Sequence, residues 1–367
     1  MQSDLLLVIV VAAALVFDFT NGFHDTANVV AAAISTRAIS PRPAVVLAAI
    51  LNFVGALLSL KVAATVATGI LSAGAVTETV AYAALVGAIA WNLVTWSYGL
   101  PSSSSHALIG GLMGALMAGV GSGAIHWHGV LTKVVEPAVV APLAAFAAAA
   151  VAIVCIYRLV ARRHPGSVGR SFRLLQLLSG GALAVAHGTN DAQKTMGIIG
   201  LALVAHGDIA VRHFHVPLWV VLTAATAMGL GTYAGGWRII RTVGTRIIKM
   251  DPPQGVAAQG AGAAVILVSS HFGYPLSSTQ VISGGVMGAG AAKRLSAVRW
   301  GVAGNIVIAW LLTLPISALL GAIAYWIAAI FGNGALGPVL IVLMAAAGAA
   351  YAIRGRRQPV ATLETGA

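Results

Sequence analysis

The chain has few charged side chains, few acids and a single cysteine. Of its 367 residues only 8% are charged, whereas a soluble globular domain carries about 25%. Nine residues are acidic, and Cys155 alone cannot form an internal disulfide. The sequence also lacks a Walker-type GxxxxGK[ST] loop, an HExxH pair, a Cys-rich metal signature and a Ser–His–Asp order. These absences exclude the usual soluble enzymes and ATP-driven machinery, so we expect no enzymatic activity and no cofactor.

Long hydrophobic runs are what the sequence has in abundance. Hydrophobic residues make up 59% of the chain, and the mean hydropathy is +0.93. Many runs reach the roughly 20 residues that a membrane-spanning helix needs. We predict an all-α polytopic membrane protein of about 10–12 transmembrane helices and hairpins. The runs lie near 5–35, 43–64, 79–99, 101–121, 130–157, 174–205, 217–236, 255–272, 275–291, 300–328 and 335–353, and 101–121 and 275–291 are short enough for re-entrant hairpins.

Basic residues cluster in alternate connections between these runs. If each run crosses the membrane once, every cluster lies on the same side, which the positive-inside rule places in the cytoplasm. We therefore predict a multi-pass protein of the cell (cytoplasmic) membrane with its N-terminus outside. The net charge of +12 then reflects topology and contact with membrane lipids, and we expect no nucleic-acid partner. The clusters are Arg37 and Arg42; Arg158, Arg162, Arg163, Arg170 and Arg173; Arg238, Arg241, Arg246 and Lys249; Lys293, Arg294 and Arg299; and Arg354, Arg356 and Arg357.

Two pairs of segments recur in the same order along the chain. NGFHDTAN at 21–28 matches HGTNDAQK at 187–194, and PSSSSHALIGGLMGA at 101–115 matches PLSSTQVISGGVMGA at 275–289. About five crossings precede the arginine-rich middle loop, and an odd number inverts the second copy. We predict a first inverted repeat at 1–157, a basic cytoplasmic linker at 158–173, a second inverted repeat at 174–353 and a short basic C-terminal tail at 354–367. Secondary transporters follow this plan, with the substrate site between the copies.

The first pair of motifs places a carboxylate in each repeat at bilayer depth. As one helix, the run 5–35 would be about 46 Å long against a core of about 30 Å, so it must tilt or break, and Thr20–Gly22 is the natural breakpoint. Asp25 lies one turn from Asn28 on the same helix face. A carboxylate in the membrane needs a cation, a proton or a donor. A structural role satisfied by neighbouring polar groups is the alternative, but the matched Asp25 and Asp191 favour a coupling-ion or proton site. Asp18 and Glu136 also fall inside predicted runs.

The second pair supplies groups that bind anions. A proline starts each segment, and the helix beginning after it leaves backbone N–H groups unpaired beside several hydroxyls. Such helix starts hold oxyanions, although serines also cap many helices without binding anything. A tetrahedral oxyanion is therefore the expected cargo. Lys194, the basic residue within these motifs, either pairs with that anion or neutralises a nearby Asp. The hydroxyls belong to Ser103, Ser104, Ser105, Ser277, Ser278 and Thr279.

These four motif copies, in this order, resemble the inorganic phosphate transporter (PiT) family, and NGFHDTANVVA followed by STRA resembles its bacterial low-affinity branch. The resemblance covers essentially the whole chain. It implies symport of inorganic phosphate, often as a neutral metal–phosphate complex, with protons. It also implies a phosphate site of Ser104, Ser105, Ser278, Thr279, Asn28 and Asn190, a coupling ion or proton at Asp25 and Asp191, and, in a sodium version, Na⁺ at Asp25, Asn28, Asn190 and Asp191. Ser103, Ser277, Lys194, His187, Gln259 and Asn52 are secondary candidates.

The sequence departs from the family pattern at several of these positions. The second motif ends in Gln193 and Lys194 where many relatives have Ala-Asn, so an exact twofold site is not expected. Asn52 and Gln259 stand where many sodium-coupled relatives carry Glu, and losing two carboxylates favours protons over sodium. Gln280 also replaces the histidine that His106 keeps in the first copy.

Several functions remain open from sequence alone. The leading hypothesis is a proton-coupled phosphate symporter that works by alternating access. A sodium-coupled symporter and a permease for sulfate or another tetrahedral oxyanion use the same donors. An ion channel lined by Ser and Gly, or a structural scaffold, belongs to a different class. A homo-oligomer is compatible with all of these.

Overall fold

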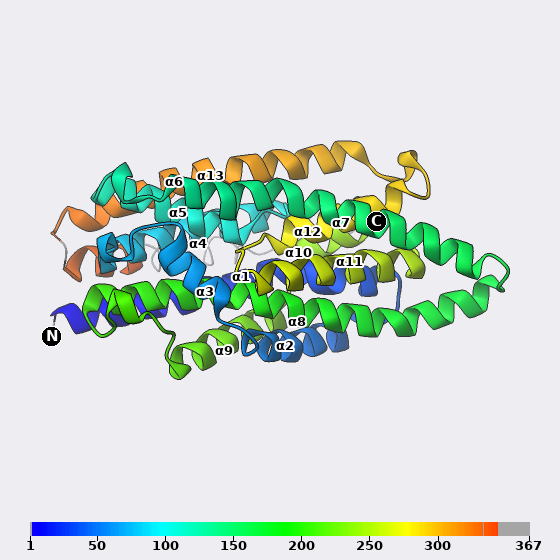
Figure 1. Ribbon diagram of the computed structural model, residues 1–367, viewed down its shortest axis with the longest axis horizontal. Coiled ribbons are helices and arrows are strands. Elements are labelled where there is room, and N and C mark those ends of the chain that lie inside the picture. Colours follow the sequence, from blue (N-terminus) through cyan, green and yellow to red (C-terminus); the bar gives the residue numbers. More distant parts are fainter. Residues whose placement is uncertain (1, 333, 344–367) are drawn as a thin grey trace, which may run out of the picture.

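The structure, a computed structural model, describes residues 2–332 and 334–343. Over these ranges the chain is a bundle of helices along one common direction (Figure 1), and the sole β-pairing is an isolated bridge between Leu71 and Ile125. The longer helices are α1 (Gln2–Ser35), α2 (Pro41–Ala56), α4 (Glu78–Tyr98), α5 (Ser104–Gly119), α7 (Glu136–Val160), α8 (Pro165–His206), α9 (Leu218–Ala234), α11 (Pro252–His271), α12 (Ser278–Ala291) and α13 (Trp300–Ala329). Shorter helices are α3 (Lys61–Ala64), α6 (Trp127–Val130) and α10 (Trp237–Arg241).

The bundle is apolar outside and polar within. Leu143 and Leu311 expose 63% and 72% of their surface, whereas Asp18, Asp191 and other ionisable side chains are wholly buried. In water this distribution would be unfavourable, because apolar surface is driven inward and charges outward. In a bilayer it is the expected one, since lipid contacts the apolar surface and polar groups satisfy one another inside. The predicted all-α membrane fold is confirmed.

Among the described residues, four helical segments are long and apolar enough to cross a membrane, and two bent pairs bring the number to six. The four are Asp4–Ser35, Glu78–Tyr98, Trp127–Val160 and Trp300–Ala329. α5 and α12 have 16 and 14 residues. At 1.5 Å per residue they are shorter than the hydrocarbon core of about 30 Å. They therefore start or end inside the membrane.

Some helix boundaries differ from the predicted ones. α1 continues without a break through Thr20–Gly22, so the breakpoint predicted there was wrong. The predicted run 43–64 is two helical segments bent by 65°, because the chain leaves helix between Ala56 and Lys61. Most of 158–173 is helical, since α7 ends at Val160 and α8 begins at Pro165. Arg354, Arg356, Arg357 and most of the predicted span 335–353 lie outside the described residues.

Equivalent helices of the two repeats run in opposite directions. The start of α1 lies beside the end of α8, where Asp4 Oδ1 is 3.3 Å from His206 Nε2, so these two motif-bearing helices are antiparallel (Figure 1). α5 and α12 begin near each other and lead away toward opposite ends of the bundle (Figure 1). This arrangement is consistent with the inverted duplication that the sequence predicted.

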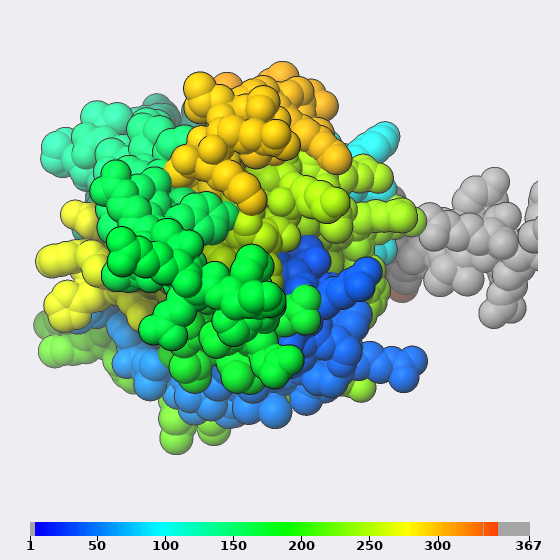
Figure 2. Space-filling view, turned by 90° about the vertical axis from the view of Figure 1, so that its right-hand side faces the viewer, coloured from blue at the N-terminus to red at the C-terminus, as the bar shows by residue number. Residues whose placement is uncertain are grey.

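The segments that carry the basic clusters lie together at one end of the molecule. Figure 2 shows this end, where the connections after α1 (blue), between α7 and α8 (green) and after α12 (gold) lie side by side with the segment around α10. These connections hold the basic clusters from Arg37 to Arg299. For the described residues, the structure thus agrees with the one-sided distribution on which the predicted topology depends.

Close helix packing depends on matching glycines in the two repeats. A Cβ on Gly114 of α5 would collide with the backbone carbonyl of Ala318 in α13, and one on Gly288 of α12 would collide with that of Phe146 in α7. α7 and α13 also carry matching internal prolines, Pro142 and Pro315. The short helices are therefore held by direct backbone contact with long neighbours.

Candidate functional site

The Asp25 carboxylate sits among hydroxyl and imidazole groups contributed by both halves of the chain. Ser104 Oγ lies 2.6 Å from Asp25 Oδ2, Thr279 Oγ1 donates to Asp25 Oδ1 at 3.1 Å, and His24 Nδ1 is 2.8 Å from the same oxygen. Asn28 Nδ2 in turn donates to Thr279 Oγ1 at 2.8 Å. All five side chains are at most 2% exposed. The first motif thus meets the start of its own repeat's α5 and the start of the other repeat's α12.

The Asp191 carboxylate has a cation of its own. Lys194 Nζ contacts Asp191 Oδ1 and Ser105 Oγ and donates to the Leu276 carbonyl at 2.6 Å. Ser105 Oγ lies 3.3 Å from Asp191 Oδ1, and His187 Nε2 lies 3.0 Å from Asp191 Oδ2. The ammonium's three N–H donors therefore have three oxygen partners. In this structure Lys194 contacts an Asp, which is one of the two roles that the sequence allowed.

The two half-sites are reciprocal. Lys194 stands at the position equivalent to Asn28, and Ser105 at that equivalent to Thr279. Each of these motif side chains contacts a hydroxyl from the other repeat, and that hydroxyl contacts the motif's own Asp. Two copies related by a twofold axis produce such reciprocal contacts. Gln280 Nε2 and His106 Nδ1, also equivalent positions, lie 3.3 Å apart and so near the axis.

The two carboxylates lie in one buried cluster. Ligand atoms of Asp25, His187 and Asp191 all lie within 4.8 Å of one another, close enough for a single metal ion. Two carboxylates at this separation repel unless a proton or cation neutralises one of them. The two carboxylic acids that sequence analysis matched are therefore brought together, and they do not face lipid.

The serine-rich helix starts divide into capping and inward-facing groups. Ser103 Oγ accepts from His106 N at 3.1 Å, and Ser277 Oγ accepts from Gln280 N at 3.3 Å, so these two secondary candidates cap α5 and α12. The next two hydroxyls of each helix are buried at the convergence of the two N-termini. Ser278 Oγ there has no hydrogen-bond partner. Helix N-termini and free hydroxyls of this kind suit an oxyanion.

Two predicted asparagines present unpaired oxygens. Asn190 Nδ2 donates to Ser270 Oγ at 2.8 Å and to the Tyr274 carbonyl at 3.0 Å. Its Oδ1, like that of Asn28, is buried without a hydrogen-bond partner. Amide oxygens of this kind are acceptors and cation ligands, not ligands of an anion.

The two remaining secondary candidates, Asn52 and Gln259, contact other residues and not the carboxylates. Asn52 Oδ1 lies 3.1 Å from His187 Nδ1, on the side of the ring away from Asp191, and so orients the imidazole. Gln259 accepts from Ser179 Oγ at 3.1 Å and donates to the Val29 carbonyl at 3.3 Å, where it links α8, α11 and α1. Gln259 therefore makes structural contacts one residue away from Asn28.

Two close partners of Asp25 were missing from the predicted site. Asn21 Oδ1 lies 2.5 Å from Ser104 Oγ, and His24 connects Asp25 to Thr95, whose Oγ1 is 3.2 Å from His24 Nε2. Both belong to the first motif. Asn21 lies four residues before Asp25, on the same helix face, and His24 directly precedes Asp25, so their spacing was the available signal. The Leu276 carbonyl, a backbone ligand of Lys194, leaves no signal in sequence.

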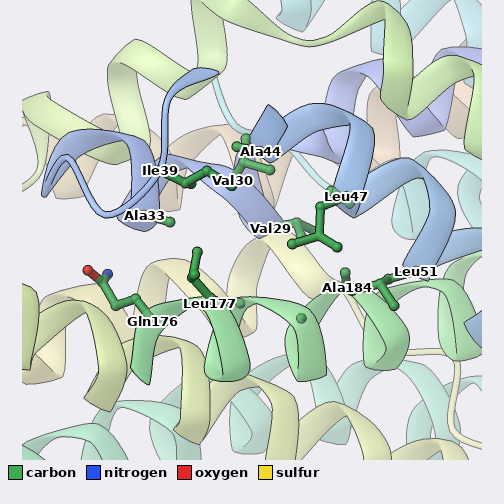
Figure 3. A pocket seen from close by; sticks show the side chains of 13 residues that line it. Val29, Val30, Ala33, Ile39, Ala44, Leu47, Leu51, Gln176, Leu177 and Ala184 are labelled. Atoms are coloured by element: carbon green, nitrogen blue, oxygen red, sulfur yellow. The ribbon is translucent and has the colours of Figure 1, made fainter. Parts of the chain in front are cut away.

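An apolar crevice near the site has few groups that could bind an oxyanion. It lies between α1, α2 and α8 (Figure 3), and among its lining residues Gln176 has the polar side chain. Thr36 Oγ1 donates to Gln176 Oε1 at 2.5 Å, and Gln176 Nε2 has no hydrogen-bond partner, so one amide donor faces an otherwise aliphatic lining. Aliphatic side chains such as Leu47 and Leu51 supply no hydrogen bond to an anion.

Comparisons with known proteins agree with this site. The chain matches the Phosphate transporter family over residues 21–169 and 161–321. It is 51% identical to a "Probable low-affinity inorganic phosphate transporter" of Mycobacterium bovis, over 97% of this chain and 85% of that one. A protein of the same name from Bacillus subtilis is 44% identical over 88% of this chain and 97% of that one. A solved structure titled "The sodium-dependent phosphate transporter" superposes with a TM-score of 0.80 at 25% identity, covering 88% of this chain and 98% of that one.

A membrane-embedded helical fold, paired motifs meeting in one buried cluster and similarity over most of the chain lead to the same conclusion. The relatives are transporters and not enzymes, as the sequence predicted. The chain belongs to the phosphate transporter family and is a multi-pass phosphate transporter of the cell membrane.

Proposed function

We propose that this protein is a proton-coupled phosphate symporter that works by alternating access between two inverted repeats. The observation that carries the proposal is the reciprocal crossing of the motifs. Each Asp is contacted by a hydroxyl from the opposite repeat, Thr279 on Asp25 and Ser105 on Asp191. A relative movement of the repeats would therefore change both half-sites together, as alternating access requires.

Phosphate would bind where α5 and α12 begin. Ser104, Ser105, Ser278 and Thr279 offer hydroxyls there, and the helix N-termini add backbone N–H groups and positive dipole ends. Nearby Asp25 and Asp191 would repel an anion unless they were neutralised. Binding of phosphate is thus linked to a proton or cation at the same carboxylates, and this linkage is the physical basis of symport.

A proton suits this site because one carboxylate already has a cation. Lys194 supplies a positive charge to Asp191 without an external ion. The positive charge that a coupling ion must still supply is then reduced to the one that Asp25 requires. A proton can provide it. Lys194 could also turn toward the phosphate once Asp191 becomes protonated, because its flexible stem carries a compact charge.

A metal–phosphate complex is a compatible form of the cargo. Asp25, His187 and Asp191 lie close enough to share one divalent ion. Carboxylate and imidazole are ligands that first-row divalent metals accept. The metal would arrive as part of the substrate and would leave with phosphate.

Sodium coupling is the second candidate, and specific observations favour it. The unpaired amide oxygens of Asn28 and Asn190 are suited to a hard cation. The superposed solved structure is titled as a sodium-dependent transporter. In this chain, however, Asn52 and Gln259 occupy positions where the family resemblance implies glutamates in many sodium-coupled relatives.

Uptake of radiolabelled phosphate into proteoliposomes tests the proposal. We expect accumulation under an inward proton gradient without sodium, collapse of that accumulation with a protonophore, and loss of transport in Asp25→Asn and Asp191→Asn. Uptake that needs sodium and survives the protonophore would establish the second candidate instead.

Competition by sulfate at several pH values tests selectivity, because phosphate retains a proton near neutral pH and sulfate does not. Adding a divalent metal or a chelator separates free phosphate from the complex.

A further inference from the structure

One buried carboxyl group has no role in the site described so far. Asp18 lies on α1 and is 0% exposed, and neither of its carboxylate oxygens has a hydrogen-bond partner. Asp25 and Asp191 differ from it, since each has several donors within reach. Asp18 is therefore a buried acid of the α1–α8 core that lacks the close donors of the two motif carboxylates.

Helix geometry connects Asp18 to the phosphate site. Asp18, Asn21 and Asp25 are spaced i, i+3 and i+7, so they lie along one face of the unbroken α1. Asn21 reaches Asp25 through Ser104, whose Oγ lies 2.5 Å from Asn21 Oδ1 and 2.6 Å from Asp25 Oδ2. Seven residues place Asp18 about 10 Å nearer the start of α1, which is the end predicted to face outside.

The second motif helix contributes a matching polar group. Thr195 of α8 neighbours the Asp18 carboxyl, follows Asp191 by one turn, is 0% exposed and has an unpaired Oγ1. The charged groups that act on Asp18 are Asp191 and Lys194, which have opposite signs. Of the other helices packed along this part of α1, α9 contains no charged residue and α4 contains Glu78 at its first position.

The chemistry of this pocket favours a proton over a metal ion. An ionised carboxylate accepts hydrogen bonds but donates none, and leaving it unpaired inside a membrane costs several kcal/mol. A protonated carboxyl both donates and accepts, and one hydroxyl plus one amide can satisfy it. Hard metal ions take about six oxygen ligands, more than Thr195 and Asn21 supply.

We propose that Asp18 is a proton-binding site separate from the phosphate site, loaded from the outer side before phosphate and its proton cross together. The inference rests on the proposed proton symport and adds the group that takes up the proton. Asp18 carries the proton in the occluded conformation and releases it when α1 and α8 move apart and water reaches the carboxyl. Phosphate recognition stays with the helix starts around Asp25 and Asp191.

The test uses the full chain in proteoliposomes, with two assays for Asp18→Asn. One assay measures phosphate accumulation under an inward proton gradient, and the other measures exchange of labelled for unlabelled phosphate without a gradient. We expect Asp18→Asn to lose accumulation down to the level of protein-free vesicles while exchange persists. Asp18→Glu, which keeps a carboxyl, should retain coupling. Asp4→Asn, the same change at a site 66% exposed on the same helix, should behave as the wild type.

The possible outcomes separate this inference from the proposed function. Wild-type accumulation that ignores the proton gradient contradicts proton symport itself. If the proton gradient drives accumulation equally in the wild type and in Asp18→Asn, the proposed role of Asp18 is overturned and proton symport stands. Loss of exchange along with accumulation would place Asp18 in the phosphate site and also overturn the inference. If Asp18→Asn does not fold, infrared spectroscopy of the wild type and Asp18→Glu decides, because a proton held here requires a carboxylic C=O band that shifts between them.

Discussion

At the scale of single residues, the chemistry of the site depends on one substitution between otherwise equivalent motifs. Asn28 and Lys194 occupy matching positions, yet one is a neutral amide and the other a buried ammonium. The ammonium contacts Asp191, whereas Asp25 relies on hydroxyls and His24. The two half-sites therefore differ by the Lys194 ammonium, although their other contacts correspond.

Removing the Lys194 ammonium should be costly to stability. A buried charge left without its partner destabilises a fold by about 3–5 kcal/mol. We therefore expect Lys194→Met to lower the apparent melting temperature of the detergent-solubilised protein markedly. Lys194→Met combined with Asp191→Asn should recover much of the loss, because no buried charge is then unpaired.

The exposed pair of Lys293 and Asp251 provides the matched control. Its atoms are 3.1 Å apart, but Lys293 is 53% exposed. Exposed ion pairs contribute about 0–1 kcal/mol, so Lys293→Met should shift the melting temperature little. Equal losses in Lys194→Met and Lys293→Met would contradict the burial argument.

At the scale of elements, the sequence predicted which segments are helical better than where they bend. Hydrophobic runs identified α1, α4, α7 and α13, since a lipid-facing helix must be apolar over its length. The 65° bend after α2 carries no distinctive composition, and α8 begins inside a charged segment that appeared to be a linker. Bends and helix extensions of this kind depend on tertiary contacts, which periodicity does not encode.

The glycines of the two short helices show how an element-scale pattern becomes a packing prediction. Alanine at Gly114 or Gly288 would push α5 or α12 away from the backbone of α13 or α7. Overpacking of this kind costs about 1–3 kcal/mol, and it also displaces the helix starts that carry the hydroxyls. We expect both variants to melt at lower temperature and to take up phosphate more slowly.

Gly304 of α13 is the control for this prediction. A Cβ there meets nothing within 4 Å, and alanine is favoured over glycine within a helix by about 1 kcal/mol. Gly304→Ala should therefore be neutral or slightly stabilising. A Gly114→Ala protein as stable and active as Gly304→Ala would show that the close contact is not required.

At the scale of the whole molecule, the site exists because segments from the two halves of the chain interlock. The pairing of Asp25 with Asp191 was predictable from their positions in the matching motifs, and the structure places them in one buried cluster. Which hydroxyl would contact which carboxylate was not predictable, since the contacts cross from one repeat to the other. The capping of α5 and α12 by Ser103 and Ser277 likewise became visible only once the backbone was placed.

This interlocking leads to a prediction about ion dependence. Lys194→Asn would make the second motif resemble the first, with an amide in place of the tethered cation. Asp191 would then lack a positive partner, and a small cation from solution is the simplest replacement. We expect phosphate uptake by Lys194→Asn to be slow without sodium and to be stimulated by it, whereas the wild type needs none.

Lys61→Asn, which removes an exposed lysine bound to the His271 carbonyl, should leave the ion dependence unchanged. If Lys194→Asn transports without any added cation and keeps its proton dependence, Lys194 does not stand in for a coupling ion, and the asymmetry between the repeats needs another explanation.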